Sequence, residues 1–216
     1  MPYLPASEPA ITEPEWQPGG QDLREVAVQL RILLDSGTSF AIATVLGTRG
    51  TALRRPGTVV VVSESGQTIG VNPAGPLDRA IRDLAAEALR TGQDRLGRLE
   101  IDHEAASYIG LCGGAGLEVH ATRVRAGDPM FGSALRYLDS GAATVLVTGT
   151  CGVSGHAVIG ADRLAGRLSR PELPAQLVED ARSMLDSRQA VHRTYRLAGE
   201  TAGAGVQVWM QSHPAL

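Results

Sequence analysis

The segment from Arg49 to Gly57 contains the first residues whose types and spacing could do chemistry. Three arginines and a threonine lie between or beside two glycines: Arg49, Gly50, Thr51, Arg54, Arg55 and Gly57. Guanidinium groups bind phosphate or carboxylate oxygens in pairs, and the backbone N–H groups of a glycine-rich turn add further donors. The segment predicts an anion site made from exposed loop arginines. The alternative is a surface hairpin whose arginines are only solvated.

Cys112 is the second candidate. It lies next to Gly113 and Gly114, which leave the sulfur open to close approach by a ligand. A thiolate is a nucleophile or a soft metal ligand, and nearby arginines favour that charged form. Cys112 is therefore the predicted catalytic residue, unless it is a buried and inert thiol.

Two stretches of the chain repeat one pattern. Asp35-Ser36-Gly37 and Asp139-Ser140-Gly141 each precede an apolar run, a glycine-rich turn, a second apolar run and a helical pattern. The copies differ at the two candidate segments. The second copy has only Val153-Ser154 in place of residues 51–56, called the arginine loop below, and it has Thr201 in place of Cys112. Matching Gly-Thr-Arg-Gly to Gly-Thr-Cys-Gly places Cys151 at the position of Arg49. Because the packing of a repeated scaffold does not need these differences, they indicate that the chemistry lies where the first copy has the arginines and the cysteine.

The elements that must position these residues follow from periodicity. Helices are predicted over 21–35, 77–91 and 173–187, with a shorter one before the second Asp-Ser-Gly. Strands are predicted over 40–46, 58–63, 67–71, 95–101, 116–124, 142–148, 156–160, 164–168, 191–197 and 205–211. Short turns between strands predict an α+β fold: two tandem repeats of mixed, largely antiparallel sheet with helices on one face, related by a pseudo-two-fold axis.

The predicted divisions are a proline-rich tail over 1–20, a first repeat over 21–125 and a second over 126–213, packed as a single unit. Each repeat is too small to bury a full core alone. Exposed sheet edges are compatible with a homodimer.

Composition excludes several classes of function. A net charge of −3 and 4% aromatic residues argue against a nucleic-acid surface. The chain contains neither an apolar run of membrane-spanning length nor a basic, apolar leader, which predicts a cytoplasmic protein without a membrane partner. The five histidines are scattered without zinc-ligand spacing, so no metal site is predicted. All 20 basic residues are arginine, which excludes lysine chemistry.

The residues from Ala43 to Leu46, from Gly50 to Gly57 and from Ile69 to Val71 resemble the N-terminal domain of the xanthine dehydrogenase accessory factor (XdhC/CoxI) family. Gly110-Leu111-Cys112-Gly113-Gly114 resembles that family's glycine-cysteine-glycine-glycine stretch. Asn72 to Pro76 stand where the family has a serine-glycine-glycine-cysteine motif, so that cysteine is absent. Longer members continue into a C-terminal Rossmann domain, whereas this sequence ends at Leu216.

The resemblance implies a maturation factor that binds the molybdenum cofactor (molybdopterin) and inserts it into a molybdenum hydroxylase such as xanthine or carbon monoxide dehydrogenase. It implies a cysteine desulfurase as a further partner. The candidate cofactor-binding residues are Arg49, Thr51, Arg54, Arg55, Gly57, Asn72, Cys112, Gly113 and Gly114. Two alternatives stay open: a stand-alone enzyme that attacks a small anionic substrate with Cys112, and an interaction subunit without a site.

Overall fold

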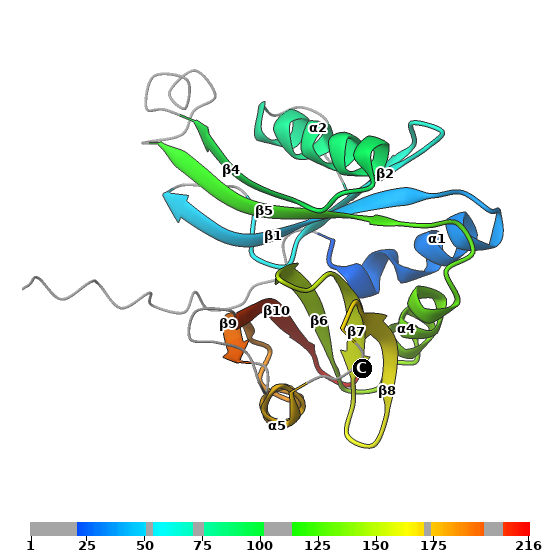
Figure 1. Ribbon diagram of the computed structural model, residues 1–216, viewed down its shortest axis with the longest axis vertical. Coiled ribbons are helices and arrows are strands. Elements are labelled where there is room, and N and C mark those ends of the chain that lie inside the picture. Colours follow the sequence, from blue (N-terminus) through cyan, green and yellow to red (C-terminus); the bar gives the residue numbers. More distant parts are fainter. Residues whose placement is uncertain (1–20, 51–53, 71–75, 102–113, 171–173, 197–204) are drawn as a thin grey trace, which may run out of the picture.

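Two five-stranded antiparallel sheets make up the fold (Figure 1). The computed structural model describes residues 21–50, 54–70, 76–101, 114–170, 174–196 and 205–216. The first sheet contains β1 (Phe40–Gly50), β2 (Val59–Ser63), β3 (Thr68–Ile69), β4 (Arg95–Ile101) and β5 (Ala115–Val124). The second contains β6 (Thr144–Cys151), β7 (Gly155–Ile159), β8 (Leu164–Leu168), β9 (Ala190–Arg196) and β10 (Gly205–His213).

The two sheets have the same strand order. It is β3-β2-β1-β5-β4 in the first and β8-β7-β6-β10-β9 in the second, so each strand has a counterpart at the same place in the other sheet. The predicted α+β fold with two similar halves is confirmed, and the predicted proline-rich tail lies outside the described residues.

The four described helices are α1 (Leu23–Asp35), α2 (Pro76–Thr91), α4 (Pro129–Asp139) and α5 (Ala175–Ser183). In each half one helix covers the outer face of the sheet: α2 packs on the first sheet and α5 on the second. Helices α1 and α4 add a further layer, because they pack against each other and against the facing sides of both sheets (Figure 1).

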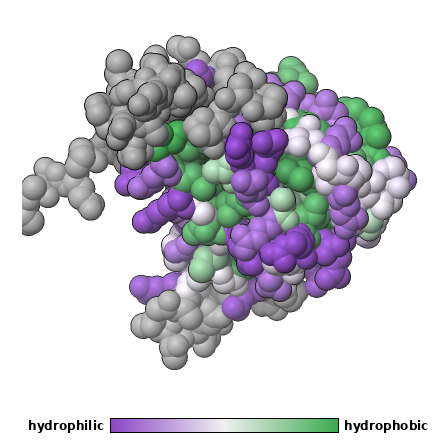
Figure 2. Space-filling view, turned by 90° about the horizontal axis from the view of Figure 1, so that it is seen from above, coloured by the Kyte–Doolittle hydropathy of each residue, from purple (hydrophilic) through white to green (hydrophobic). Residues whose placement is uncertain are grey.

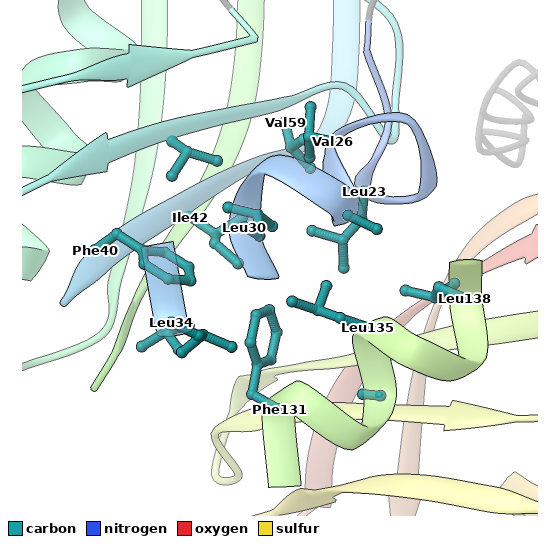
Figure 3. Close-up of a cluster of buried hydrophobic side chains, with 14 of the residues drawn as sticks. Leu23, Val26, Leu30, Leu34, Phe40, Ile42, Val59, Phe131, Leu135 and Leu138 are labelled. Carbon is teal, nitrogen blue, oxygen red and sulfur yellow. The ribbon is translucent and has the colours of Figure 1, made fainter. Parts of the chain in front are cut away.

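The α1–α4 layer contains the largest apolar cluster. Figure 3 shows Leu30 of α1, Leu135 of α4 and Ile42 of β1 pointing toward one another, and all three are 1% exposed or less. Fully burying one such side chain contributes about 1.5–3 kcal/mol. The cluster includes Leu146 and Val158 of the second sheet, so it joins the two halves.

Local sequence explains why both helices begin where they do. Asp22 accepts a hydrogen bond from the backbone of Glu25, whose side chain accepts one from Asp22, which is a capping box. Asp128 caps α4 through the N–H groups of Met130 and Phe131. Arg24 then ties α1 to the second half by donating to the carbonyl oxygens of Ala142 and Pro214, each at 2.6 Å.

The strand registers correct one detail of the repeat. The central strand of each sheet has one extra residue where it pairs with its neighbour, at Leu46 in β1 opposite β5 and at Thr150 in β6 opposite β10. Matching these bulges pairs Cys151 with Gly47, so the predicted match of Cys151 with Arg49 is wrong by two residues. The sequence match failed because it aligned the glycine punctuation, whereas pairing across the sheet determines which face each side chain takes.

The surface on the α2 side mixes charged and apolar side chains (Figure 2). The exposed positions of α2 include Arg79, Asp83, Glu87 and Arg90, whereas Ile81, Ala85 and Ala88 are buried against the sheet. None of the helices in the described ranges is long and apolar enough to span a membrane.

Candidate functional site

The two candidate loops leave the first sheet at the same place. Gly50, where β1 ends before the arginine segment, pairs with Ala115, where β5 begins after the cysteine segment. Ile101, the last residue of β4, also pairs with Ala115. The antiparallel order of β1, β5 and β4 therefore brings the bases of the two loops together, although the segments are more than 50 residues apart in sequence.

Arg54 is fixed on the first turn of α2. Its Nε and Nη2 donate to the two carboxylate oxygens of Asp78, each at 2.9 Å, so the pair is bidentate. The side chains of Arg54 and Asp78 are only 14% and 11% exposed. The expectation that Arg54 is an exposed loop charge is therefore wrong, because a carboxylate on the helix removes it from solvent.

Arg49 and Arg55 remain accessible. Arg49 lies on β1 opposite Gly116, and its Nη2 donates to Glu100 Oε1 at 2.9 Å in a pair whose side chains are 71% and 65% exposed. Such an exposed pair contributes little to folding, about 0–1 kcal/mol. Arg55 is exposed, and its carbonyl oxygen accepts from the backbone N–H of Thr58 in the turn that leads into β2.

Gly57 lies against the second half of the molecule rather than in the open loop. Its φ is +91°, and a Cβ placed there would lie 2.4 Å from Gln211 Nε2 of β10. The positive φ is what favours glycine here, since the atoms near the added Cβ belong to the flexible end of the Gln211 side chain. Gly114 is exposed just before β5. Thr51, Asn72, Cys112 and Gly113 lie outside the described residues.

Sequence reasoning missed a polar cluster between the sheets. His156 of β7 forms a hydrogen bond between its Nδ1 and Thr148 Oγ1 at 3.0 Å, and its Nε2 is buried without a hydrogen-bond partner among the described residues. His120 of β5 is 1% exposed, and neither ring nitrogen has a hydrogen-bond partner in the described part of the chain. The positions of these histidines in sequence gave no signal, since different strands of both halves supply them.

Burial controls the charge of these histidines. Desolvation, helped by His120, lowers the pKa of His156 to about 3. Desolvation also lowers the pKa of His120, and His192 adds to that effect while Asp94, 3.8 Å away, opposes it. Both rings therefore lie neutral between the sheets at neutral pH. The described residues contain no group of three or more side chains suited to hold a metal ion.

An open hollow of about 460 Å³ lies at the other end of α2, away from the arginine loop. It is lined by Val62, Leu89, Arg90 and Arg123, among others, and Arg123 Nη2 donates to Glu64 Oε1 at 3.2 Å across it. The carbonyl groups at the carboxyl end of a helix disfavour an anion there. This hollow is therefore a weaker candidate than the arginine loop.

Comparison with known protein families finds a match in the first half of the chain, which contains the candidate loop arginines. Residues 33–102 match the model of the XdhC and CoxI family. That range begins near the end of α1 and includes the arginine loop, α2 and β4. No curated protein matches the chain.

Among solved structures, the chain is similar in fold to the crystal structure of a xanthine dehydrogenase from Bacillus halodurans, with a TM-score of 0.54 and 15% sequence identity. The match covers 87% of this chain and 52% of that one, so the chain spans about half the length of this solved protein. At this identity the likeness concerns the fold alone. The two findings are separate: residues 33–102 are similar in sequence to the XdhC and CoxI family, and the solved structure shows a likeness of fold.

Proposed function

We propose that this protein binds the molybdenum cofactor and acts as an accessory factor in the maturation of a molybdenum hydroxylase. The observation that carries the proposal is the family match over residues 33–102, which contains the arginine loop that the second half of the molecule lacks. The molybdenum hydroxylase is the implied partner, and a cysteine desulfurase is the implied source of sulfur for the cofactor.

The donor groups near the loop suit the phosphate of a pterin cofactor. Arg54 has a fixed guanidinium, and Arg55 beside it is exposed and cationic. Fixed guanidinium donors recognise phosphate through paired hydrogen bonds, and an accessible second arginine adds charge. These residues would hold the phosphate end of the cofactor, and Arg49 lies on the neighbouring strand end.

Cys112 is the proposed contact for the reactive end of the cofactor, which would supply a molybdenum–dithiolene centre. The base of its loop lies beside the base of the arginine loop, because Ala115 pairs with Gly50. A thiolate is a soft ligand suited to such a centre. The counterpart of Cys112 in the second half, 89 residues further on, is Thr201, so the scaffold itself does not require sulfur.

A stand-alone enzyme on the same scaffold is the second candidate. The observation that favours it is the segment Asn72 to Pro76, which has no cysteine where the family has one. In this case Cys112 would attack a small anionic substrate held by Arg49 or Arg54. Retained cofactor supports the first candidate, and a covalent adduct on Cys112 supports the second.

Binding of a pterin phosphate monoester, compared with the same pterin without phosphate, tests the role of the arginines by calorimetry. Arg55→Gln should lower affinity for the phosphorylated ligand about fivefold to tenfold with an unchanged melting temperature, since Arg55 is exposed. Arg54→Gln should lower the same affinity and also the melting temperature, because it leaves Asp78 without its partner. Arg125→Gln, another exposed arginine, is the matched control.

Native mass spectrometry of the protein from its own host tests the identity of the ligand. The wild type should retain the cofactor, and Cys112→Ser should lose it with little change in melting temperature. A wild type that binds neither the cofactor nor the phosphorylated pterin contradicts the proposal.

A further inference from the structure

Asp78 is the described residue that fixes the orientation of Arg54. It lies in the first turn of α2, and its two carboxylate oxygens take the Nε and Nη2 hydrogens of the guanidinium at 2.9 Å. Both side chains are almost completely removed from solvent, which limits the other rotamers open to Arg54. A loop arginine is thereby held as rigidly as the helix that carries its partner.

The second half of the molecule folds without this pair. Buried Ile81 and Ala85 of α2 match buried Leu177 and Ala181 of α5, a shift of 96 residues that places Pro174 opposite Asp78. The arginine loop is also shortened there to Val153-Ser154. Helix α5 forms and covers its sheet in the absence of both members. The fold of one repeat therefore does not require the pair, and the two residues occur together where the candidate site lies.

Among the described residues, the pair leaves the outer edge of the guanidinium for another ligand. Asp78 uses the Nε–Nη2 edge, and in the described ranges Nη1 donates one long hydrogen bond, of 3.5 Å, to the carbonyl oxygen of Gly70. Hydrogens on Nη1 and Nη2 can still donate in parallel to two oxygens of one oxyanion. Asp78 neutralises the charge of Arg54, but exposed Arg55 beside it keeps the loop cationic.

We propose that Asp78 is a positioning residue, which aims the free edge of Arg54 at the phosphate of the bound pterin. This inference rests on the proposed function, because it assumes a phosphate-bearing ligand at the arginine loop. Asp78 makes no contact with that ligand. Its contribution is geometric: an arginine already held in its binding rotamer loses less conformational freedom when the ligand arrives.

The test uses the full chain, a pterin phosphate monoester and the same pterin without its phosphate. Asp78→Asn keeps the shape of the side chain but removes its charge and one acceptor, so the affinity for the phosphorylated pterin should fall about tenfold. The affinity for the phosphate-free pterin should change less than about twofold, because Asp78 acts only through Arg54. Asp83→Asn, at an exposed position of the same helix, should change neither affinity.

The double variant supplies the second readout, because the effects of the two substitutions on binding should not add. In Arg54→Gln the arginine is already lost, so adding Asp78→Asn should weaken phosphate-dependent binding no further. Asp78→Glu retains the carboxylate and should recover part of the affinity lost in Asp78→Asn. Equal losses for both pterins in Asp78→Asn would show a purely structural role and overturn the inference.

The failure of this inference is distinguishable from that of the proposed function. If Arg54→Gln weakens phosphate-dependent binding while Asp78→Asn leaves it unchanged, Asp78 does not position Arg54 and the proposed function stands. If the wild type does not distinguish the two pterins, the phosphate contact is absent and both proposals fail.

Discussion

Two matching rows of side chains cross the facing sides of the sheets, and they differ in polarity. In the first sheet the row is Val59, Thr44, His120 and Leu96. In the second sheet it is His156, Thr148, Trp209 and His192. Both rows are centred on a buried threonine. Two glycines show which residues of the two rows correspond. Gly70 lies against the carbonyl oxygen of Val59, and Gly166 lies against that of His156, so Val59 and His156 are counterparts.

The difference between the rows shows what the duplicated scaffold requires. Close approach of a glycine to a neighbouring strand recurs in both halves and belongs to the fold. The histidines do not recur in place, since His156 matches Val59 and His120 matches Trp209. Repetition of the sequence therefore does not predict that His120 of one half lies close enough to His156 of the other to lower its pKa.

The largest expected effect is the loss of stability on replacing either of the two corresponding glycines, Gly70 and Gly166. A Cβ at Gly70 would lie 2.3 Å from Val59 O, and one at Gly166 would lie 2.5 Å from His156 O, with φ near +80° at both positions. Gly70→Ala and Gly166→Ala should each lower the free energy of unfolding by about 4 kcal/mol, because strain and a backbone clash add. Urea denaturation measures both values.

The matched control for these variants is Gly66→Ala, which has a φ of +80° with no atom within 4 Å of the added Cβ. It should cost only about 1–2 kcal/mol, the cost of the left-handed conformation itself. If Gly70→Ala is severe and Gly166→Ala is mild, the two rows are not structural counterparts.

The second effect is loss of stability in acid. The pKa of buried His156 is about 3 in the folded protein, below its usual value of 6.5, because burial disfavours the charged ring. The unfolded chain therefore binds more protons than the folded one between these values, and stability falls as the pH decreases through 6.5. Between pH 7.5 and pH 5 the loss from His156 should be about 2 kcal/mol.

His156→Val sharpens this prediction, because it gives the second row the residue that the first row has at the matching place. The variant should show a shallower dependence of unfolding free energy on pH between 7.5 and 5. This range lies above the ordinary pKa values of carboxyl groups. His120, whose pKa burial also lowers, faces Asp94 and His192 and should supply the remaining slope. An unchanged slope in His156→Val would mean that His156 is not buried in its neutral form.

The smallest expected effect is a difference in unfolding free energy between substitutions of the two buried threonines, Thr44 and Thr148. Thr148 is hydrogen-bonded to His156, whereas Thr44 has no such bond to His120, whose ring nitrogens make no hydrogen bond within the described residues. Thr148→Val should therefore cost about 1–2 kcal/mol of unfolding free energy by leaving His156 Nδ1 unsatisfied. Thr44→Val should cost less than about 0.5 kcal/mol by the same measurement. Equal costs would remove the distinction between the rows.

The candidate site was only partly predictable. The sequence predicts an anion-binding role for Arg54, which stays a prediction, and it predicts an exposed side chain, which is wrong. The partner Asp78 is 24 residues away, and no local pattern joins the two. Gly57 was assigned to a ligand, whereas its described contact is Gln211 of the other half. Roles that depend on Thr51, Asn72, Cys112 and Gly113 stay predictions.

The sequence by itself determined the elements and their repetition. Apolar periodicity placed the helix that contains Ile81 and the strand that contains Val61, because hydrophobic spacing reflects which side of an element is buried. Tertiary structure alone decided which distant residues interact: His120 acts electrostatically on His156 between the sheets, and Arg54 binds Asp78 within the first half. Such pairs arise from strand register and from the packing of distant segments, which depend on the whole chain and leave no mark in the spacing of either partner.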